Sequence, residues 1–386
     1  MAKVVAQQKM TKLFREFFES EKAGGLILIA VTIVSLIIAN SNYGEVYDSF
    51  WHHKLAGLSI EHWINDGLMA IFFLLIGLEL EREIYIGELS DFRNTLLPFS
   101  GALGGMLIPA GLFALINSGL PSASGAGIPM ATDIAFAIGI LSLLGNKVPL
   151  SVKVFLTALA VIDDLGAILV IAIFYSSNIS LNYLFASLTV FALLLLLNRL
   201  KVHRVWPYIV GGIAMWFFML NSGIHATITG VMLAFAIPFG NGDHKTSSSK
   251  IQHFLHKPVA FLILPIFALA NTAINFEGNI IESLSSPISL GILLGLVVGK
   301  PLGILLFSWI SVKLKISILP ADLNWGSLLG AGMLAGIGFT MSIFIALLAF
   351  TDPAMINNSK LAILAGSLLS GMIGFIWLSI VLKRKK

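Results

Sequence analysis

Four ionisable residues lie deep within long apolar stretches of this sequence: Asp133, Asp163, Asp164 and Lys300. A charge at the centre of a bilayer costs at least about 2.5–3.5 kcal/mol, so such residues pair with one another or face a water-filled cavity. They commonly mark the pathways of ions and protons. Because burial favours the neutral form of an ionisable group, the three carboxylates and one ammonium predict a site that exchanges protons inside a membrane.

Asp163 and Asp164 are adjacent in the chain. Neighbouring residues of an α-helix point about 100° apart, so one carboxylate can face a cavity while the other pairs with a cation on another helix. Lys300 is the only deep cation in the sequence. A purely structural ion pair is the alternative, but it would leave one of these aspartates and Asp133 without a partner.

Glycine or proline interrupts two of the apolar stretches near their middle, at Gly127 and Pro129 and at Gly336 and Gly338. Such a break frees backbone carbonyls and creates half-helix ends that carry opposite partial charges. Packing of helices through small residues is the alternative for glycines. We prefer a functional role for the two breaks.

Oxygen donors and charges accompany these breaks. Freed carbonyls, the Thr132 hydroxyl and the aspartate carboxylates suit Na⁺ or Li⁺ better than transition metals. We expect Asp133 to balance the positive half-helix N-termini and Lys300 the negative C-termini. For Gly101, Gly104 and Gly105 we expect close helix packing instead.

The composition identifies the surroundings of these residues as lipid. Of 386 residues, 57% are hydrophobic and 11% are charged, which is about half the charged fraction of a soluble domain. Several runs of 18 or more apolar residues are each long enough to cross a bilayer. A soluble enzyme, a disordered chain and a nucleic-acid binder are excluded. With no cysteine, disulfides, Fe–S clusters, thiolate zinc sites and thiol nucleophiles are excluded as well.

We predict an all-α membrane protein, a single transporter domain over residues 1–386 with about twelve transmembrane helices. Residues 1–22 are expected to form a cytoplasmic or interfacial segment, residues 41–59 an outer loop or hairpin, and residues 240–257 a flexible cytoplasmic linker. The predicted spans are roughly 23–40, 60–80, 95–117, 121–144, 150–175, 181–198, 205–221, 223–239, 258–275, 287–311, 327–350 and 360–382.

The distribution of Lys and Arg orients these spans. With the N-terminus inside, 21 of the 24 basic residues fall on cytoplasmic segments, and only Lys54 and Lys360 fall on outer loops. This bias predicts that both termini are cytoplasmic.

A weak internal similarity relates the two interrupted spans. Gly125–Ile128 begins the fourth span and Gly330–Met333 the eleventh, with the same Gly-Ala-Gly start. Because the fourth span runs inward and the eleventh outward, we predict inverted-topology repeats at about 95–175 and 287–382.

Several ionisable residues outside this centre are candidates for sensing pH. Glu79 and Arg82 lie at the inner end of span two, in a funnel or a surface ion-pair cluster. His225 follows a tight turn, where a local structural role is the favoured alternative. His253 and His256 lie near the inner surface, where a solvated linker would contain them equally well.

At these residues the sequence resembles the bacterial Na⁺/H⁺ antiporters of the NhaA type, from about residue 10 to the C-terminus. Six motifs together carry the resemblance: Phe72–Glu79 (FFLLIGLE), Pro129–Phe136 (PMATDIAF), Leu159–Leu165 (LAVIDDL), Ser222–Thr227 (SGIHAT), Gly299–Pro301 (GKP) and Gly336–Thr340 (GIGFT).

The resemblance implies electrogenic exchange of Na⁺ or Li⁺ for more than one H⁺, driven by the proton gradient, by twelve helices of which two are unwound and cross. Asp163 and Asp164 would be the pair that exchanges the ion for protons, with Thr132 beside them. Lys300 would be the partner of Asp163, and Asp133 would compensate the helix ends.

The resemblance also implies regulation and assembly. A pH-sensing inner face would involve Glu79, Arg82, His253 and His256, but Gln252 stands where pH-regulated members carry Glu, which puts the strength or midpoint of activation in doubt. The outer hairpin at about 44–58 would form a homodimer in the bacterial inner membrane. No catalytic activity, cofactor, nucleic acid or protein ligand is implied; the partner is the lipid bilayer.

Three other functions share some of these features. A symporter for an organic solute would need a larger cavity with more polar donors. A cation channel fits an internal Lys poorly. An intramembrane aspartyl protease needs two carboxylates that share a proton, and Lys300 at the same depth would hold them ionised.

Overall fold

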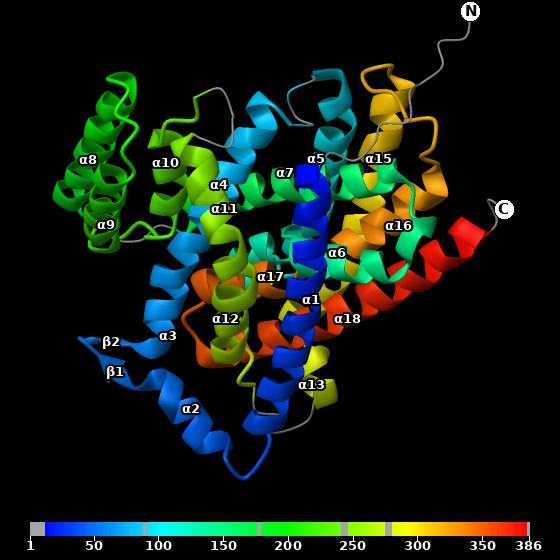
Figure 1. Ribbon diagram of the computed structural model, residues 1–386. Helices are drawn as coiled ribbons and strands as arrows, with labels where there is room; N and C mark the ends of the chain where they lie inside the picture. Colours follow the sequence, from blue (N-terminus) through cyan, green and yellow to red (C-terminus); the bar gives the residue numbers. More distant parts are fainter. Residues whose placement is uncertain are drawn as a thin grey trace, which may run out of the picture.

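The computed structural model describes residues 12–87, 90, 92–175, 179–240, 246–274 and 280–383. Residues 1–11 of the expected N-terminal segment and 241–245 of the expected linker lie outside the described residues. Most of the described chain is helical, as Figure 1 shows. The helices are α1 (Lys12–Ala39), α2 (Gly44–His52), α3 (Ile60–His62), α4 (Met69–Tyr85), α5 (Phe92–Ile116), α6 (Ile134–Leu143), α7 (Leu150–Phe174), α8 (Leu181–Arg199), α9 (Trp206–Leu220), α10 (Ile228–Ala236), α11 (Ser247–Pro258), α12 (Leu264–Asn271), α13 (Ile280–Leu284), α14 (Pro287–Leu294), α15 (Lys300–Lys313), α16 (Trp325–Ala335), α17 (Phe339–Ala349) and α18 (Pro353–Lys383).

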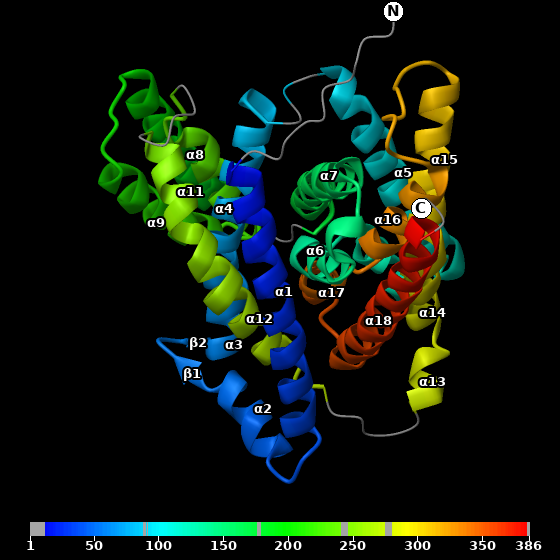
Figure 2. The same cartoon turned by 45° about the vertical axis from the view of Figure 1, so that its right-hand side comes forward.

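The helices form two groups, which Figure 2 separates. One group contains α1, α4 and α8 to α12, and the other contains α5 to α7 and α13 to α18. Within the groups α4 packs along α10 and α5 along α15, and α1 packs against α6 where the groups meet. The short broken helices α6 and α17 therefore lie inside the bundle, where long helices surround them (Figure 1).

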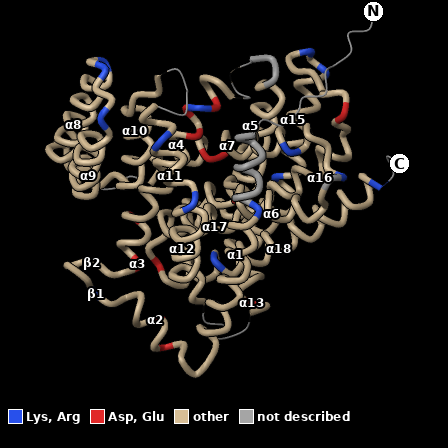
Figure 3. The backbone as a smooth tube through the Cα atoms, in the orientation of Figure 1, with Lys and Arg blue, Asp and Glu red and all other residues tan. Residues whose placement is uncertain are grey.

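Eight helices in the described ranges are long and apolar enough to cross a membrane, and two bent helix pairs raise this number to ten. Three of the eight are continuous through π-helical turns, which join α3 to α4, α11 to α12 and α14 to α15. Figure 3 shows that most Lys and Arg residues lie in the upper half of the molecule and that its lower half carries few charged residues. This is the architecture of a multi-pass membrane protein.

Two of the twelve expected spans are shorter than expected. Helix α9 has 15 residues and α10 only 9. Helix α10 ends at Ala236 because Pro238 restricts Ile237 to an extended conformation, with ψ of 135°. It begins late because Gly223, at a φ of +83°, turns the chain before it. The count of twelve spans stays a prediction.

The expected flexible linker at residues 240–257 is wrong from Ser247 onward, because the chain is helical there. Thr246 is the N-cap of α11, and its side chain accepts a hydrogen bond from the backbone N–H of Ser249. The Ser247 hydroxyl donates to the carbonyl of His203 at 2.7 Å. The run of serines that indicated a linker is therefore a capped helix start.

The segment that follows α1 contains α2 and a two-stranded antiparallel hairpin, β1 (Lys54–Leu55) and β2 (Leu58–Ser59). Ala56 and Gly57 form its turn with φ of 51° and 90°, a conformation that favours glycine. This small sheet projects from the lower end of the bundle in Figure 1.

Close packing at glycines, predicted for Gly101, Gly104 and Gly105, is confirmed. A Cβ atom added at Gly104 would collide with the backbone carbonyl of Gly303, and one added at Gly105 would lie 2.8 Å from Ile304. Helices α5 and α15 therefore approach each other backbone to backbone, which sets the position of Lys300 at the start of α15.

Candidate functional site

Two bent pairs of short helices lie at the centre of the molecule. A 3₁₀ helix (Pro121–Met130) meets α6 at an angle of 44°, and α16 meets α17 at 48°. Gly127 and Pro129 lie within the 3₁₀ helix, so the first break itself consists of residues 131–133. Gly336 and Gly338 lie in the second break.

The two breaks contact each other directly. The backbone N–H of Asp133 donates to the carbonyl of Ile337 at 2.7 Å. The Thr132 hydroxyl lies 3.0 Å from the carbonyl oxygen of Ala335, the last residue of α16. Backbone groups that the breaks leave without helical partners therefore satisfy one another.

Asp133 caps the N-terminal ends of both following half-helices. Its Oδ1 accepts a hydrogen bond from the backbone N–H of Phe136 in α6 at 3.0 Å. Its Oδ2 accepts from the backbone N–H and from the hydroxyl of Thr340 in α17, at 3.1 and 2.5 Å. One buried carboxylate thus faces two positive helix ends, the arrangement that stabilises a negative charge.

Replacing Thr340 with valine is expected to lower the free energy of unfolding by about 1.5–3 kcal/mol, because a hydrogen bond to a charged group is lost at a buried site. Titration with a denaturing detergent would measure it. Thr340→Ser keeps the hydroxyl and is expected to lose less than half as much. Equal losses in the two variants would mean that the methyl group, not the hydrogen bond, matters.

Asp163 lies at the meeting point of α7, α15 and the first break. Its Oδ2 is 3.0 Å from the Lys300 ammonium and 2.7 Å from the Thr132 hydroxyl. Lys300 also donates a hydrogen bond to the carbonyl of Met130, the last residue of the 3₁₀ helix. The ammonium therefore faces both a carboxylate and a half-helix C-terminus, where positive charge is favourable. The side chains of Asp163 and Lys300 are fully buried.

Asp164 follows Asp163 on α7, and the side chains of adjacent helical residues leave the axis about 100° apart. It is 1% exposed. Within the part of the chain that the structure describes, Oδ1 of Asp164 and Oδ1 of Asp163 are buried without a hydrogen-bond partner. Two carboxylate oxygens on adjacent residues of α7 are thus without a partner, and Asp163 also contacts the Thr132 hydroxyl through its other oxygen. Oxygen donors of these kinds suit Na⁺ or Li⁺.

The predicted pH-sensing residues separate into two places. His256 on α11 lies 3.6 Å from Glu79 on α4, measured from Nδ1 to Oε1. Arg82 pairs with Glu83 at 3.1 Å, and His253 is exposed on α11. The pair of Glu79 and His256 therefore lies where α11 packs against α4.

His225 does not lie with them. It occupies the loop between α9 and α10, where its Nε2–H donates to the carbonyl of Tyr175 at 2.8 Å. Burial lowers the pKa of His225, although this hydrogen bond and the charge of Asp66 oppose the shift. The hydrogen bond ties this loop to Tyr175 at the end of α7.

Sequence reasoning assigned no role to Thr340 or to the carbonyls of Met130 and Ala335. Thr340 is the second residue of the half-helix α17, and a hydroxyl at a helix start is the signal that could have identified it. The carbonyls carry no sequence signal, since every residue has one.

Comparison with known proteins gives consistent matches over nearly the whole chain. The sequence model of a family described as Na⁺/H⁺ antiporter 1 matches residues 15–378. A Na⁺/H⁺ antiporter NhaA of Flavobacterium psychrophilum is 63% identical over 375 residues, which cover 97% of this chain and 98% of the relative. A Na⁺/H⁺ antiporter NhaA of Cytophaga hutchinsonii is 61% identical over 375 residues, which cover 97% of this chain and 97% of the relative.

A solved structure shares the fold at low sequence identity. The sodium proton antiporter MjNhaP1 from Methanocaldococcus jannaschii matches with a TM-score of 0.52 and 17% identity, over 98% of both chains.

Proposed function

Because this chain belongs to the Na⁺/H⁺ antiporter 1 family, we propose that it exchanges Na⁺ or Li⁺ for H⁺ across the inner membrane of a bacterium. The proposed exchange is electrogenic and serves sodium and pH homeostasis. The relatives are named as antiporters, which are transporters rather than enzymes.

One observation carries the proposed site. Two adjacent carboxylates, Asp163 and Asp164, are buried beside two broken helices, and each has an oxygen without a hydrogen-bond partner among the described residues. We propose that these carboxylates and Thr132 bind the cation. Asp133 and Lys300 would compensate the charges of the half-helix ends.

Competition between Na⁺ and H⁺ for one site would couple the movement of the two ions. If Na⁺ and H⁺ bind the same carboxylates, the empty, deprotonated site carries buried negative charge and is costly to reorient across the membrane. Either load reduces this charge, and alternating access then carries a cation out and protons in. Acid pH on the cytoplasmic side would inhibit by the same competition.

The number of ionisable groups in the site supports the proposed electrogenic exchange. Asp163, Asp164 and Lys300 form one cluster in which the binding of one monovalent cation can displace more than one proton. Net positive charge then moves inward in each cycle, so the membrane potential as well as the proton gradient would drive exchange.

The proposed architecture has twelve spans and cytoplasmic termini. Inverted repeats at about 95–175 and 287–382 would each contribute one of the two bent helix pairs, and these would cross at the membrane centre. The whole chain would form one transporter domain.

Regulation and assembly would use separate surfaces. Glu79 and Arg82 of α4 and His253 and His256 of α11 are the proposed pH-sensing group, and the 3.6 Å approach of Glu79 and His256 supports it. With Gln252 in place of a carboxylate, the strength or midpoint of activation is expected to differ from relatives that carry Glu. The hairpin of β1 and β2 is the proposed contact for a homodimer.

Reconstituted liposomes test the function. With an acid interior and a trapped pH dye, external NaCl or LiCl is expected to make the interior alkaline between pH 6.5 and 8.5, whereas KCl and choline chloride are expected to have no effect. Electrogenicity would appear as a dependence of the rate on an imposed potential. No response to Na⁺ at any pH would reject antiport and make a symporter the leading alternative.

A further inference from the structure

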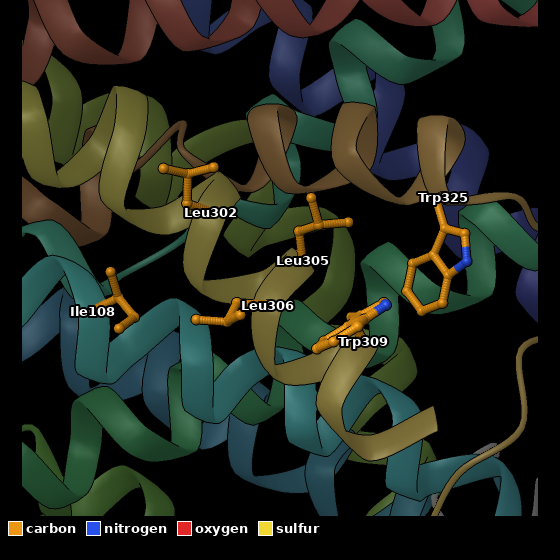
Figure 4. Close-up of a pocket in the computed structure, with 6 residues that line it drawn as sticks. All are labelled: Ile108, Leu302, Leu305, Leu306, Trp309 and Trp325. Carbon is orange, nitrogen blue, oxygen red and sulfur yellow. The ribbon is translucent and has the colours of Figure 1, made fainter. Parts of the chain in front are cut away.

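An apolar groove of about 610 Å³ runs along α15 on the outside of the bundle, and Figure 4 shows its lining. Four residues of α15 at spacings of three, four and seven share one helix face. Leu302, Leu306 and Trp309 are each 44–52% exposed. The lining residues are Leu302, Leu305, Leu306 and Trp309 of α15, Ile108 of α5 and Trp325 of α16.

The groove lies on a helix that is long and apolar enough to cross a membrane, so we expect its exposed side to face hydrocarbon. Helix α15 belongs to the continuous apolar span Pro287–Lys313. From Leu302 to Trp309 the helix rises about 10 Å, whereas the hydrocarbon of one leaflet is about 15 Å thick. The length therefore matches the part of an acyl chain that lies nearest the headgroup.

A cation stands at one end of this groove. Lys313, the exposed last residue of α15, has its ammonium 4.6 Å from the centroid of the Trp309 ring. Indole rings beside a basic residue are typical of the interface between headgroups and hydrocarbon. A basic residue beside a groove between transmembrane helices complements an anionic phosphate.

The groove is built on a rigid base. Next to Leu302, Gly303 meets Gly104 of α5 so closely that a Cβ on either would collide with the other's carbonyl. Close backbone contact beneath the lining side chains means that the groove exists before anything binds, which lowers the cost of binding.

We propose that this groove is a binding site for an anionic phospholipid, with one acyl chain along Leu302, Leu306 and Trp309 and the headgroup phosphate at Lys313. This inference is independent of the transported ion. It concerns the lipid-facing side of α15, not the buried side that carries Lys300.

Fluorescence quenching by lipids with brominated acyl chains tests the proposal on the full-length protein. The protein is reconstituted in phosphatidylcholine vesicles that contain either brominated phosphatidylglycerol or brominated phosphatidylcholine. The signal of the groove is the fluorescence of the wild type minus that of a variant with Trp309→Phe and Trp325→Phe. We expect phosphatidylglycerol to reach half-maximal quenching of this signal at an about fivefold lower mole fraction, the effect of one basic residue near the surface.

Charge variants identify the headgroup contact. Lys313→Gln is expected to remove the preference for phosphatidylglycerol, and Lys313→Arg to keep it. Lys250→Gln, at an exposed position on α11 in the other helix group, is the matched control and is expected to keep the preference as well.

Three results would overturn the proposal. Equal quenching by both lipids in the wild type would reject headgroup recognition. A loss of preference in Lys250→Gln as large as in Lys313→Gln would reject the role of Lys313. No quenching by either lipid would mean that another protein segment, such as a second copy of the chain, covers the groove.

Discussion

Replacing Asp164 with asparagine is expected to abolish Na⁺-driven proton movement, to the rate of liposomes without protein, while the protein stays folded. Asparagine has nearly the same shape as aspartate but carries no charge and exchanges no proton at neutral pH. Asp164 is buried and lies outside the contacts that hold Asp163, Thr132 and Lys300 together. Its neutralisation therefore removes a ligand for the ion and the protons without breaking an ion pair of the site.

The liposome assay with the trapped pH dye measures this loss, and the elution profile on size exclusion checks the fold. Glu282→Gln, an exposed carboxylate on α13, is the matched control and is expected to keep full exchange. Undiminished Na⁺-driven alkalinisation in Asp164→Asn would remove Asp164 from the proposed site.

Replacing Lys300 with methionine is expected to lower the free energy of unfolding by about 3–5 kcal/mol, because it leaves the buried carboxylate of Asp163 without its counter-charge. The Met130 carbonyl at the end of the 3₁₀ helix also loses its donor. The loss should shrink as the pH falls, since a protonated Asp163 needs no counter-charge. Unfolding in a denaturing detergent at several pH values would measure both effects.

A double variant distinguishes the contribution of the ion pair to stability from that of side-chain packing. Adding Asp163→Asn to Lys300→Met removes the uncompensated charge, so the double variant is expected to recover a substantial part of the lost stability. Lys250→Met, at an exposed position, should change the stability by less than about 0.5 kcal/mol. If the two losses at positions 163 and 300 simply add, the pair does not contribute as a pair.

Composition and periodicity were sufficient to predict the kind of molecule. Long apolar runs have no stable place in water, and the cost of a charge in lipid makes Asp133, Asp163, Asp164 and Lys300 conspicuous in the sequence alone. Glycine and proline weaken a helix by local backbone effects that need no tertiary contact, so the sequence also indicated where two segments would bend. The structure has one bend just after Pro129, at residues 131–133, and the other at residues 336–338.

The sequence-based prediction was wrong for helices whose ends depend on particular turns and caps. A serine-rich stretch resembles a linker, but the N-cap at Thr246 and the bond from Ser247 to His203 make it the helix α11. Helix α10 is shorter than a span because Gly223 and Pro238 bound it. Such ends are set by backbone conformations that hydropathy does not report.

The partners of the buried charges depended on the packing of helices far apart in the chain. From the residues alone, Lys300 had either aspartate as a partner, and the structure places it 3.0 Å from Asp163. Thr340 contacts Asp133 across 207 positions of sequence, and Lys300 contacts the carbonyl of Met130 across 170. The residue types show which charged groups need a partner, because a charged side chain within an apolar stretch is costly wherever its partner comes from. Which group supplies the compensation is decided by how the two bent helix pairs pack against each other, because a carbonyl or hydroxyl acts on a charge only within hydrogen-bond distance.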